Sequence, residues 1–128
     1  MMRQRKVRIF FDGGCRPNPG EMEIAVVAQG RTFISQNLGF GTNNDAEWLA
    51  LIEGLRIARS LDLPDFVLVG DSAMVVNQAN GAKCGSPEFR THLETFRALA
   101  LPLGGVRVRR IGRAHNLAGI ALATLHDR

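Results

Sequence analysis

The alternation of apolar and polar positions near the start of the chain predicts a β-strand. In residues 7–12, VRIFFD, every second residue is β-branched or aromatic, and this period of two is typical of strands. The segment is apolar on both faces near its end, which favours a central position in a sheet. Asp12 ends the predicted strand, and Gly13, Gly14 and an Asn18-Pro19-Gly20 turn follow it.

Four further strands follow from similar patterns. Residues 24–28 and 31–38 are predicted to be strands joined by a hairpin turn at Gln29-Gly30, so the first three strands form an antiparallel meander. The continuous apolar run FVLVG, residues 66–70, is typical of a strand that is buried on both faces. A Gly-Gly turn precedes a fifth predicted strand over residues 106–111.

A long helix is predicted over residues 45–60. Asn44 and Glu47 have the spacing of a capping box at its start. Apolar residues occupy much of the helix circumference, so we expect the helix to pack against the sheet. Glu47 lies one turn before Leu51 and two turns before Leu55, on the face that is expected to meet the sheet.

Three shorter helices complete the pattern. They are predicted over residues 72–78, from the Ser86-Pro87 start to Ala100, and over residues 115–125. The order β-β-β-α-β-α-α-β-α excludes a purely parallel sheet. It predicts a mixed α/β fold with a five-stranded sheet and helices on both faces. At 128 residues, the chain is expected to form one domain over residues 1–128.

Composition excludes several classes of protein. The hydrophobic content of 45% and charged content of 22% are ordinary for a globular chain, and every apolar run is far shorter than the roughly 18 residues of a membrane helix. The N-terminus is basic but lacks the apolar segment of a signal peptide, so we expect a cytoplasmic protein without a membrane partner. Cys15 and Cys84 are expected to be free thiols, because no CxxC pair or disulfide framework is present.

The positive charge has two interpretations. The formal net charge is +4, and basic residues gather in residues 3–8 and again at positions 107, 109, 110 and 113. Such clusters are typical of phosphate-binding surfaces, but the modest net charge taken alone favours a solvated face. The arginines near the C-terminus, on the last strand and the loop after it, are the ones that we expect near a phosphate.

Three acids occupy places where an isolated carboxylate is costly. Asp12 and Asp71 follow predicted buried strands, and Glu47 lies on the inner face of the long helix. Each acid alone is explained by a local cap or turn. If the strands at 7–12 and 66–70 are parallel neighbours, however, all three meet at one sheet edge, where they require neutralising cations. Mg²⁺ or Mn²⁺ suits oxygen ligands, and two such ions about 4 Å apart support phosphodiester cleavage.

Four segments resemble the ribonuclease H family of small bacterial or archaeal type. They are IFFDGGCRPNPG, TNNDAEWLALIEGL, VLVGDSAMVVNQANG and RIGRAHNLAGIALA, and together they cover most of the chain in the order of the family. The resemblance implies a ribonuclease H-like fold and hydrolysis of the RNA strand of RNA–DNA hybrids. It also implies that Asp12, Glu47 and Asp71 are catalytic carboxylates that bind two Mg²⁺ or Mn²⁺ ions.

The resemblance further implies which residues lie along the RNA strand, where backbone and side-chain amides contact 2′-hydroxyl groups. The 2′-hydroxyl group is the feature that distinguishes RNA from DNA. The implied nucleic-acid-binding residues are Gly13, Gly14, Cys15, Arg16, Asn18, Asn43 and Asn44.

The chain departs from the family pattern at a fourth acid. The family places an acid four residues after an asparagine, whereas this chain has Asn116 followed by Ile120 at that position, with Gly119 before it. Neither residue binds a metal, so we expect weaker metal occupancy and impaired cleavage. His115 is implied as a helper in proton transfer or product release, and a surface histidine at a helix start is an equally good interpretation.

Two other functions stay open. One is a catalytically degenerate nucleic-acid-binding module with the same fold, and the other is a structural or protein-interaction domain. No motif in the sequence indicates a protein partner.

Overall fold

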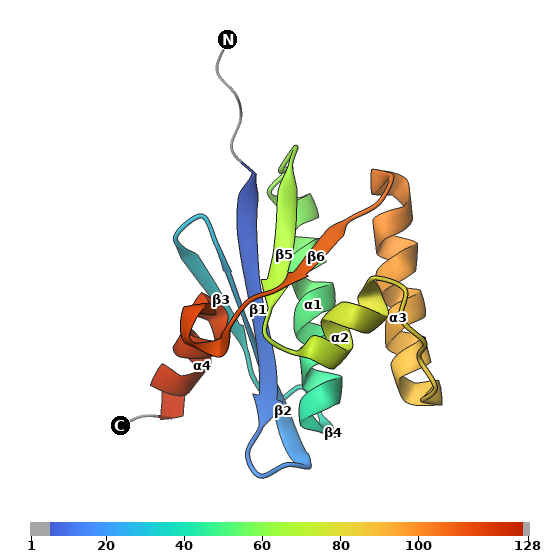
Figure 1. The fold of residues 1–128 in the computed structure, drawn as a ribbon. Helices are drawn as coiled ribbons and strands as arrows, with labels where there is room; N and C mark the ends of the chain where they lie inside the picture. Colours follow the sequence, from blue (N-terminus) through green and yellow to red (C-terminus); the bar gives the residue numbers. More distant parts are fainter. Residues whose placement is uncertain (1–5, 127–128) are drawn as a thin grey trace.

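The structure is a computed structural model that describes residues 6–126; most of the basic N-terminal segment, residues 1–5, lies outside the described residues. The sheet has the strand order β3-β2-β1-β5-β6 (Figure 1). β1 pairs antiparallel with β2 and parallel with β5, and the short β4 pairs with β2 away from this path. The strands are β1 Val7–Cys15, β2 Gly20–Ala28, β3 Arg31–Ser35, β4 Phe40–Gly41, β5 Phe66–Gly70 and β6 Arg107–Arg110.

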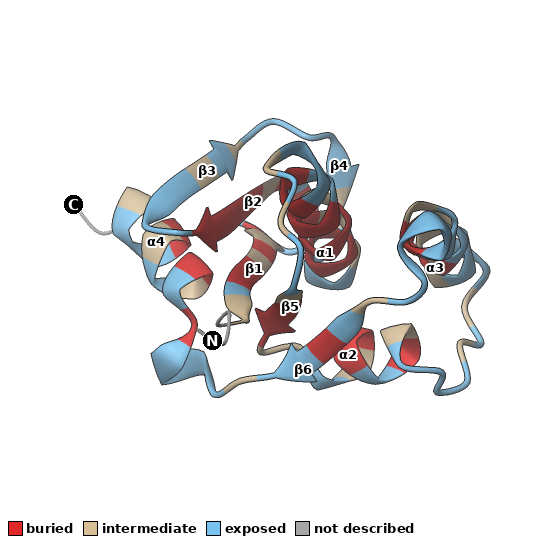
Figure 2. Ribbon diagram, turned by 90° about the horizontal axis from the view of Figure 1, so that it is seen from above, coloured by how far each residue is buried: buried red, intermediate tan, exposed pale blue. Residues whose placement is uncertain are grey.

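Helices lie on both faces of the sheet (Figures 1 and 2). α1 and α3 lie on one face and α4 on the other, so the predicted mixed α/β architecture is confirmed. No helix within residues 6–126 is long and apolar enough to cross a membrane. The helices are α1 Asn43–Ser60, α2 Ala73–Ala79, α3 Pro87–Ala100 and α4 Leu117–His126, with short 3-10 turns at Leu101–Leu103 and Arg113–His115.

Alternation along β1 separates two apolar cores. Ile9 and Phe11 are fully buried beneath α1, which is apolar over much of its surface as predicted. Phe10 points to the opposite face and packs with Ala118 and Leu122 of α4. β1 is therefore buried on both faces and lies in the middle of the sheet, which confirms its predicted central position.

Several predicted boundaries were wrong. β1 does not end at Asp12 but continues to Cys15, because β2 begins at Gly20 and pairs with it throughout. β3 ends at Ser35 rather than residue 38. The short β4 gives the sheet a sixth strand beyond the five predicted.

The capping box of α1 was also predicted at the wrong residues. Thr42, not Asn44, is the N-cap, and its side chain accepts a hydrogen bond from the Asp45 amide at 3.2 Å. The Asp45 carboxylate accepts a bond from the Thr42 amide at 3.1 Å. Glu47 therefore takes no part in capping the helix.

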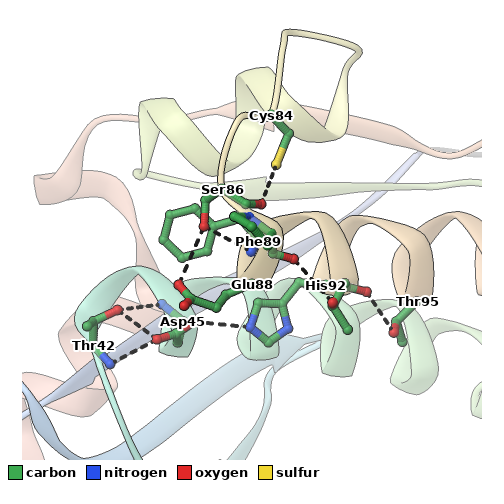
Figure 3. A network of polar contacts seen from close by, with 10 residues as sticks. Thr42, Asp45, Cys84, Ser86, Glu88, Phe89, His92 and Thr95 are labelled. Carbon is green, nitrogen blue, oxygen red and sulfur yellow. Dashed lines mark hydrogen bonds and ion pairs between the residues drawn. The ribbon is translucent and has the colours of Figure 1, made fainter.

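A polar network joins the start of α3 to the first turn of α1 (Figure 3). Nε2 of His92 lies 3.2 Å from the Asp45 carboxylate, and the His92 ring stacks on Trp48. Burial pushes the pKa of Asp45 upward, but hydrogen bonds from Thr42 and the neighbouring His92 outweigh it and hold that pKa below its usual value. The network fixes the end of α1 from which Glu47 projects.

Candidate active site

Asp12 and Asp71 meet because β1 is longer than its parallel neighbour. The pairing of β1 with β5 stops at Phe10 and Val69, and Asp71 follows directly after β5. Asp12 lies two residues beyond the last residue pair between β1 and β5. Along this part of β1, the edge that faces β5 is unpaired. The two strands are parallel neighbours, which is the condition under which Asp12 and Asp71 were expected to meet, and the pairing places both acids at the same end of the sheet.

Glu47 reaches this uncovered edge from α1. Its Oε1 accepts a hydrogen bond from the Gly13 amide at 2.9 Å, and its side chain is buried. α1 approaches β1 closely here, since a Cβ atom on Gly13 would lie only 2.2 Å from the Ala46 carbonyl oxygen. The glycine after Asp12 thus allows the helix to deliver a carboxylate to the strand.

Replacing Gly13 with alanine is expected to lower the free energy of unfolding by about 1–3 kcal/mol, because α1 must move to relieve the overlap. The same displacement carries Glu47 away from the other acids. Chemical denaturation measures the loss, and Gly85→Ala is the matched control because a Cβ atom there meets open space. Equal stability of the two variants would contradict the close approach of α1 and β1.

The three carboxylates converge in one pocket. One oxygen from each of Asp12, Glu47 and Asp71 lies within 4.8 Å of the others. Burial and the charge of Asp71 raise the pKa of Asp12 to about 7, and burial and the charge of Asp12 raise the pKa of Glu47 to about 9. The cluster resists full ionisation at neutral pH without a cation, and its oxygen donors suit a divalent hard metal ion.

Asn116 holds the third carboxylate in place, a role that sequence reasoning missed. This fully buried side chain donates from Nδ2 to the Phe11 carbonyl and to the Asp71 carboxylate, both at 3.0 Å. Its Oδ1 accepts a hydrogen bond from the Ala118 amide at 3.1 Å. The sequence signals were its match to the asparagine of the family pattern and its place at a helix start, which is also the pattern of an ordinary N-cap.

α4 forms the wall opposite α1 and carries the missing acid position. Gly119 faces Asp12, since a Cβ atom there would lie 3.6 Å from the Asp12 carboxylate. Ile120 lines the same cleft and is 48% exposed. Arg113, just before α4, also lines it, and its charge partly opposes the rise in the pKa of Asp12 that burial causes. His115 is exposed and is not among the residues that line the cleft.

The cleft has a volume of about 630 Å³, and most of the residues implied to contact RNA lie along it. Asn18 is the exception, because it lines an adjacent cavity instead. The two loops are nevertheless joined: Asn18 Oδ1 accepts from the Asn43 amide at 3.0 Å, and Asn43 Oδ1 accepts from the Cys15 amide at 2.9 Å. Cys15 and Cys84 are free thiols, as predicted. The lining residues from the implied set are Gly13, Gly14, Cys15, Arg16, Asn43 and Asn44.

Comparison with protein families places the chain. The RNase H family model matches residues 4–93, which is more than half of the sequence. The chain belongs to the RNase H family. The match covers the elements that carry Asp12, Glu47 and Asp71 and ends before β6 and α4, where the sequence departs from the family pattern.

Relatives of this RNase H family protein match nearly all of the chain. Ribonuclease HI of Halobacterium salinarum is 32% identical over 128 residues, which is 92% of this chain and 62% of that protein. A bifunctional protein of Mycobacterium tuberculosis is 33% identical over 125 residues, with 92% of this chain and 34% of that protein covered. The chain thus spans about three fifths and one third of the length of these relatives.

Solved structures agree with this family. The crystal structure of the Halobacterium salinarum RNase H1 has a TM-score of 0.84 and 31% identity, covering 97% of this chain and 100% of that chain. LC11-RNase H1, isolated from compost, was crystallised in complex with RNA/DNA hybrid. It has a TM-score of 0.77 and 29% identity, covering 88% of this chain and 89% of that chain. The ribonuclease H-like fold expected from the sequence is confirmed.

Proposed function

We propose that this RNase H family protein hydrolyses the RNA strand of RNA–DNA hybrids, using Mg²⁺ or Mn²⁺ held by Asp12, Glu47 and Asp71. The single observation that carries the proposal is the convergence of these three carboxylates in an open cleft. A hybrid-bound relative, LC11-RNase H1, supports the choice of substrate. We also propose that residues 1–128 act as one domain.

The residues of the site divide the work between ligation and positioning. Asp12, Glu47 and Asp71 supply carboxylate oxygens. The Gly13 amide orients Glu47 and the Asn116 amide orients Asp71, so neither side chain is free to turn away. Asp12, Glu47 and Asp71 would hold a divalent ion, which would supply activation of a water nucleophile and neutralisation of phosphate charge.

Recognition of RNA is assigned to the loops on the α1 side of the cleft. Oδ1 of Asn43 is engaged by the Cys15 amide, which leaves its Nδ2 as a donor, and Asn44 is exposed. These amides face the cleft that holds the carboxylates, so a strand bound there presents its 2′-hydroxyl groups to them. Arg16 lies in the loop between β1 and β2, lines the same cleft and adds a positive charge for phosphate.

The absence of a carboxylate at Ile120 favours a second candidate, a binding module that holds the hybrid without turnover. Isoleucine neither ligates a metal nor accepts a hydrogen bond, so the water-activating side of the site has fewer ligands than the family pattern supplies. We therefore expect cleavage to be slow. Binding of the hybrid without cleavage is the second candidate function.

A labelled hybrid incubated with the purified chain and Mg²⁺ or Mn²⁺ tests the proposal. The expected result is cleavage of the RNA strand that requires metal and disappears in Asp12→Asn, because the Asp12 carboxylate is lost while its shape is kept. Hybrid binding is measured in parallel. Cleavage no greater than that of Asp12→Asn rejects the enzyme, and retained binding then identifies the binding module.

A further inference from the structure

The face of the sheet that bears α4 continues onto β5 and β6. Residues that are aligned in neighbouring parallel strands point to the same face of the sheet. Two rows of aligned residues therefore run across β1, β5 and β6 on the face to which Asp12 points. α4 packs against β1, β2 and β3, at the other end of this face. In Figure 2, β6 lies at the far end of the sheet from α4. The rows are Arg8, Val67 and Arg107, and then Phe10, Val69 and Arg109.

Three arginines flank an apolar floor on these rows. Phe10, Val67 and Val69 are buried, whereas Arg8, Arg107 and Arg109 are exposed; we call these three arginines the arginine face. The guanidinium of Arg8 lies 5.2 Å from the centre of the Phe10 ring. The aliphatic parts of the arginine side chains cover the apolar floor, and their charged groups stay in water.

The arginine face has no partner charge among the described residues. Within residues 6–126, none of its three arginines forms an ion pair, although Asp65 and Arg107 line the same shallow cavity. The array is an uncompensated positive surface, which attracts polyanions over a distance of about 8–10 Å at moderate salt.

The arginine face lies nearer the start of β1, β5 and β6, beyond the segment that connects β6 to α4. β6 runs parallel to β5, so its C-terminal end and Arg113 lie at the end of the sheet where Asp71 follows β5. Arg107 aligns with Val67, four residues before Asp71, which at a rise of about 3.3 Å per residue is a span of about 13 Å. A polyanion that is bound in the cleft and is long enough to pass this connecting segment can reach the arginine face.

We propose that the arginine face, Arg8, Arg107 and Arg109, binds the sugar-phosphate backbone of a hybrid outside the cleft. Arg107 and Arg109 project from one strand about 7 Å apart, so each can contact a different phosphate. The apolar residues of this surface are buried, and only the guanidinium groups are exposed. Guanidinium groups bind phosphate oxygens well, whereas an apolar side chain of a protein partner would find no exposed apolar surface here. This inference rests on the proposed function for its substrate, but it concerns binding and not turnover.

The test compares two double variants that remove the same charge. Arg107→Gln/Arg109→Gln alters the proposed surface, and Arg56→Gln/Arg97→Gln alters exposed arginines on α1 and α3. Each is titrated with a hybrid of about 16 base pairs, in Ca²⁺ and over a salt series.

The first variant is expected to raise Kd about tenfold and to reduce the slope of log K against log salt by about two. The control variant is expected to show little change. Equal effects of both variants overturn the inference, while binding by the wild-type chain leaves the proposed function standing. Failure of the wild-type chain to bind the hybrid rejects both, whereas absence of cleavage with the difference between the two variants intact rejects only the nuclease.

Discussion

Replacing Ile120 with aspartate is expected to raise the rate of hybrid cleavage in Mg²⁺ about a hundredfold over the unaltered chain. Ile120 lines the cleft from α4 and is half exposed, so a carboxylate there has access to the pocket and remains hydrated. It adds an oxygen ligand on the α4 wall opposite Glu47, where α4 now presents a glycine and apolar side chains. Initial rates of cleavage of a labelled hybrid measure the gain.

Ile120→Asn is the matched control, because asparagine has the shape of aspartate without its charge. Calorimetric titration with Mn²⁺ provides a second readout, and tighter binding is expected only for the aspartate variant. The gain must also vanish when Asp12→Asn is added, since both residues then belong to one site. Similar rates for the aspartate and asparagine variants would show that charge at position 120 is irrelevant to catalysis.

The metal-free protein is expected to lose several kcal/mol of stability as the pH rises from about 5 to about 8. The folded-state pKa of Asp12 is raised from 3.8 to about 7 and that of Glu47 from 4.5 to about 9, chiefly by burial. Between pH 4 and 9 the folded chain therefore binds more protons than the unfolded chain. The contribution of these two groups to the free energy of unfolding is therefore greatest below pH 4. It declines as rising pH ionises them.

Divalent ions are expected to reverse this decline. A metal that binds the ionised cluster at a hundred times its Kd adds about 2.7 kcal/mol of stability. Thermal unfolding at pH 5 and pH 8, with and without Mg²⁺, provides the measurement. In Glu47→Gln, both the pH dependence and the response to metal are expected to shrink, because one buried charge is absent. A pH-independent Tm in the unaltered, metal-free chain would contradict the raised pKa values.

The elements and the three acids were predictable because they depend on local patterns. The apolar run at 66–70 and the alternation at 7–12 identified two buried strands. Their parallel pairing, stated as a condition, was sufficient to bring Asp12 and Asp71 together. The long apolar helix was then expected to pack against the sheet, and Glu47 lay on the helix face that meets the sheet.

Features that depend on tertiary contacts were not predictable. Two overlapping pairs in the sequence have capping-box spacing, Thr42 with Asp45 and Asn44 with Glu47. The Gly13 amide engages Glu47 and leaves the earlier pair to form the cap. Likewise, Gly13 and Gly14 resemble a turn, but pairing with β2 keeps them in the strand. The role of Asn116 depends on two elements far away in the sequence.

The half-exposed position of Ile120 has an evolutionary consequence. Substitutions at such a place usually change folding stability by less than about 0.5 kcal/mol, so the fold exerts almost no restraint on which residue occupies it. Selection for turnover alone would maintain an acid there. If the proposed function holds, catalytic activity can therefore be lost or regained through a single residue while the architecture stays intact.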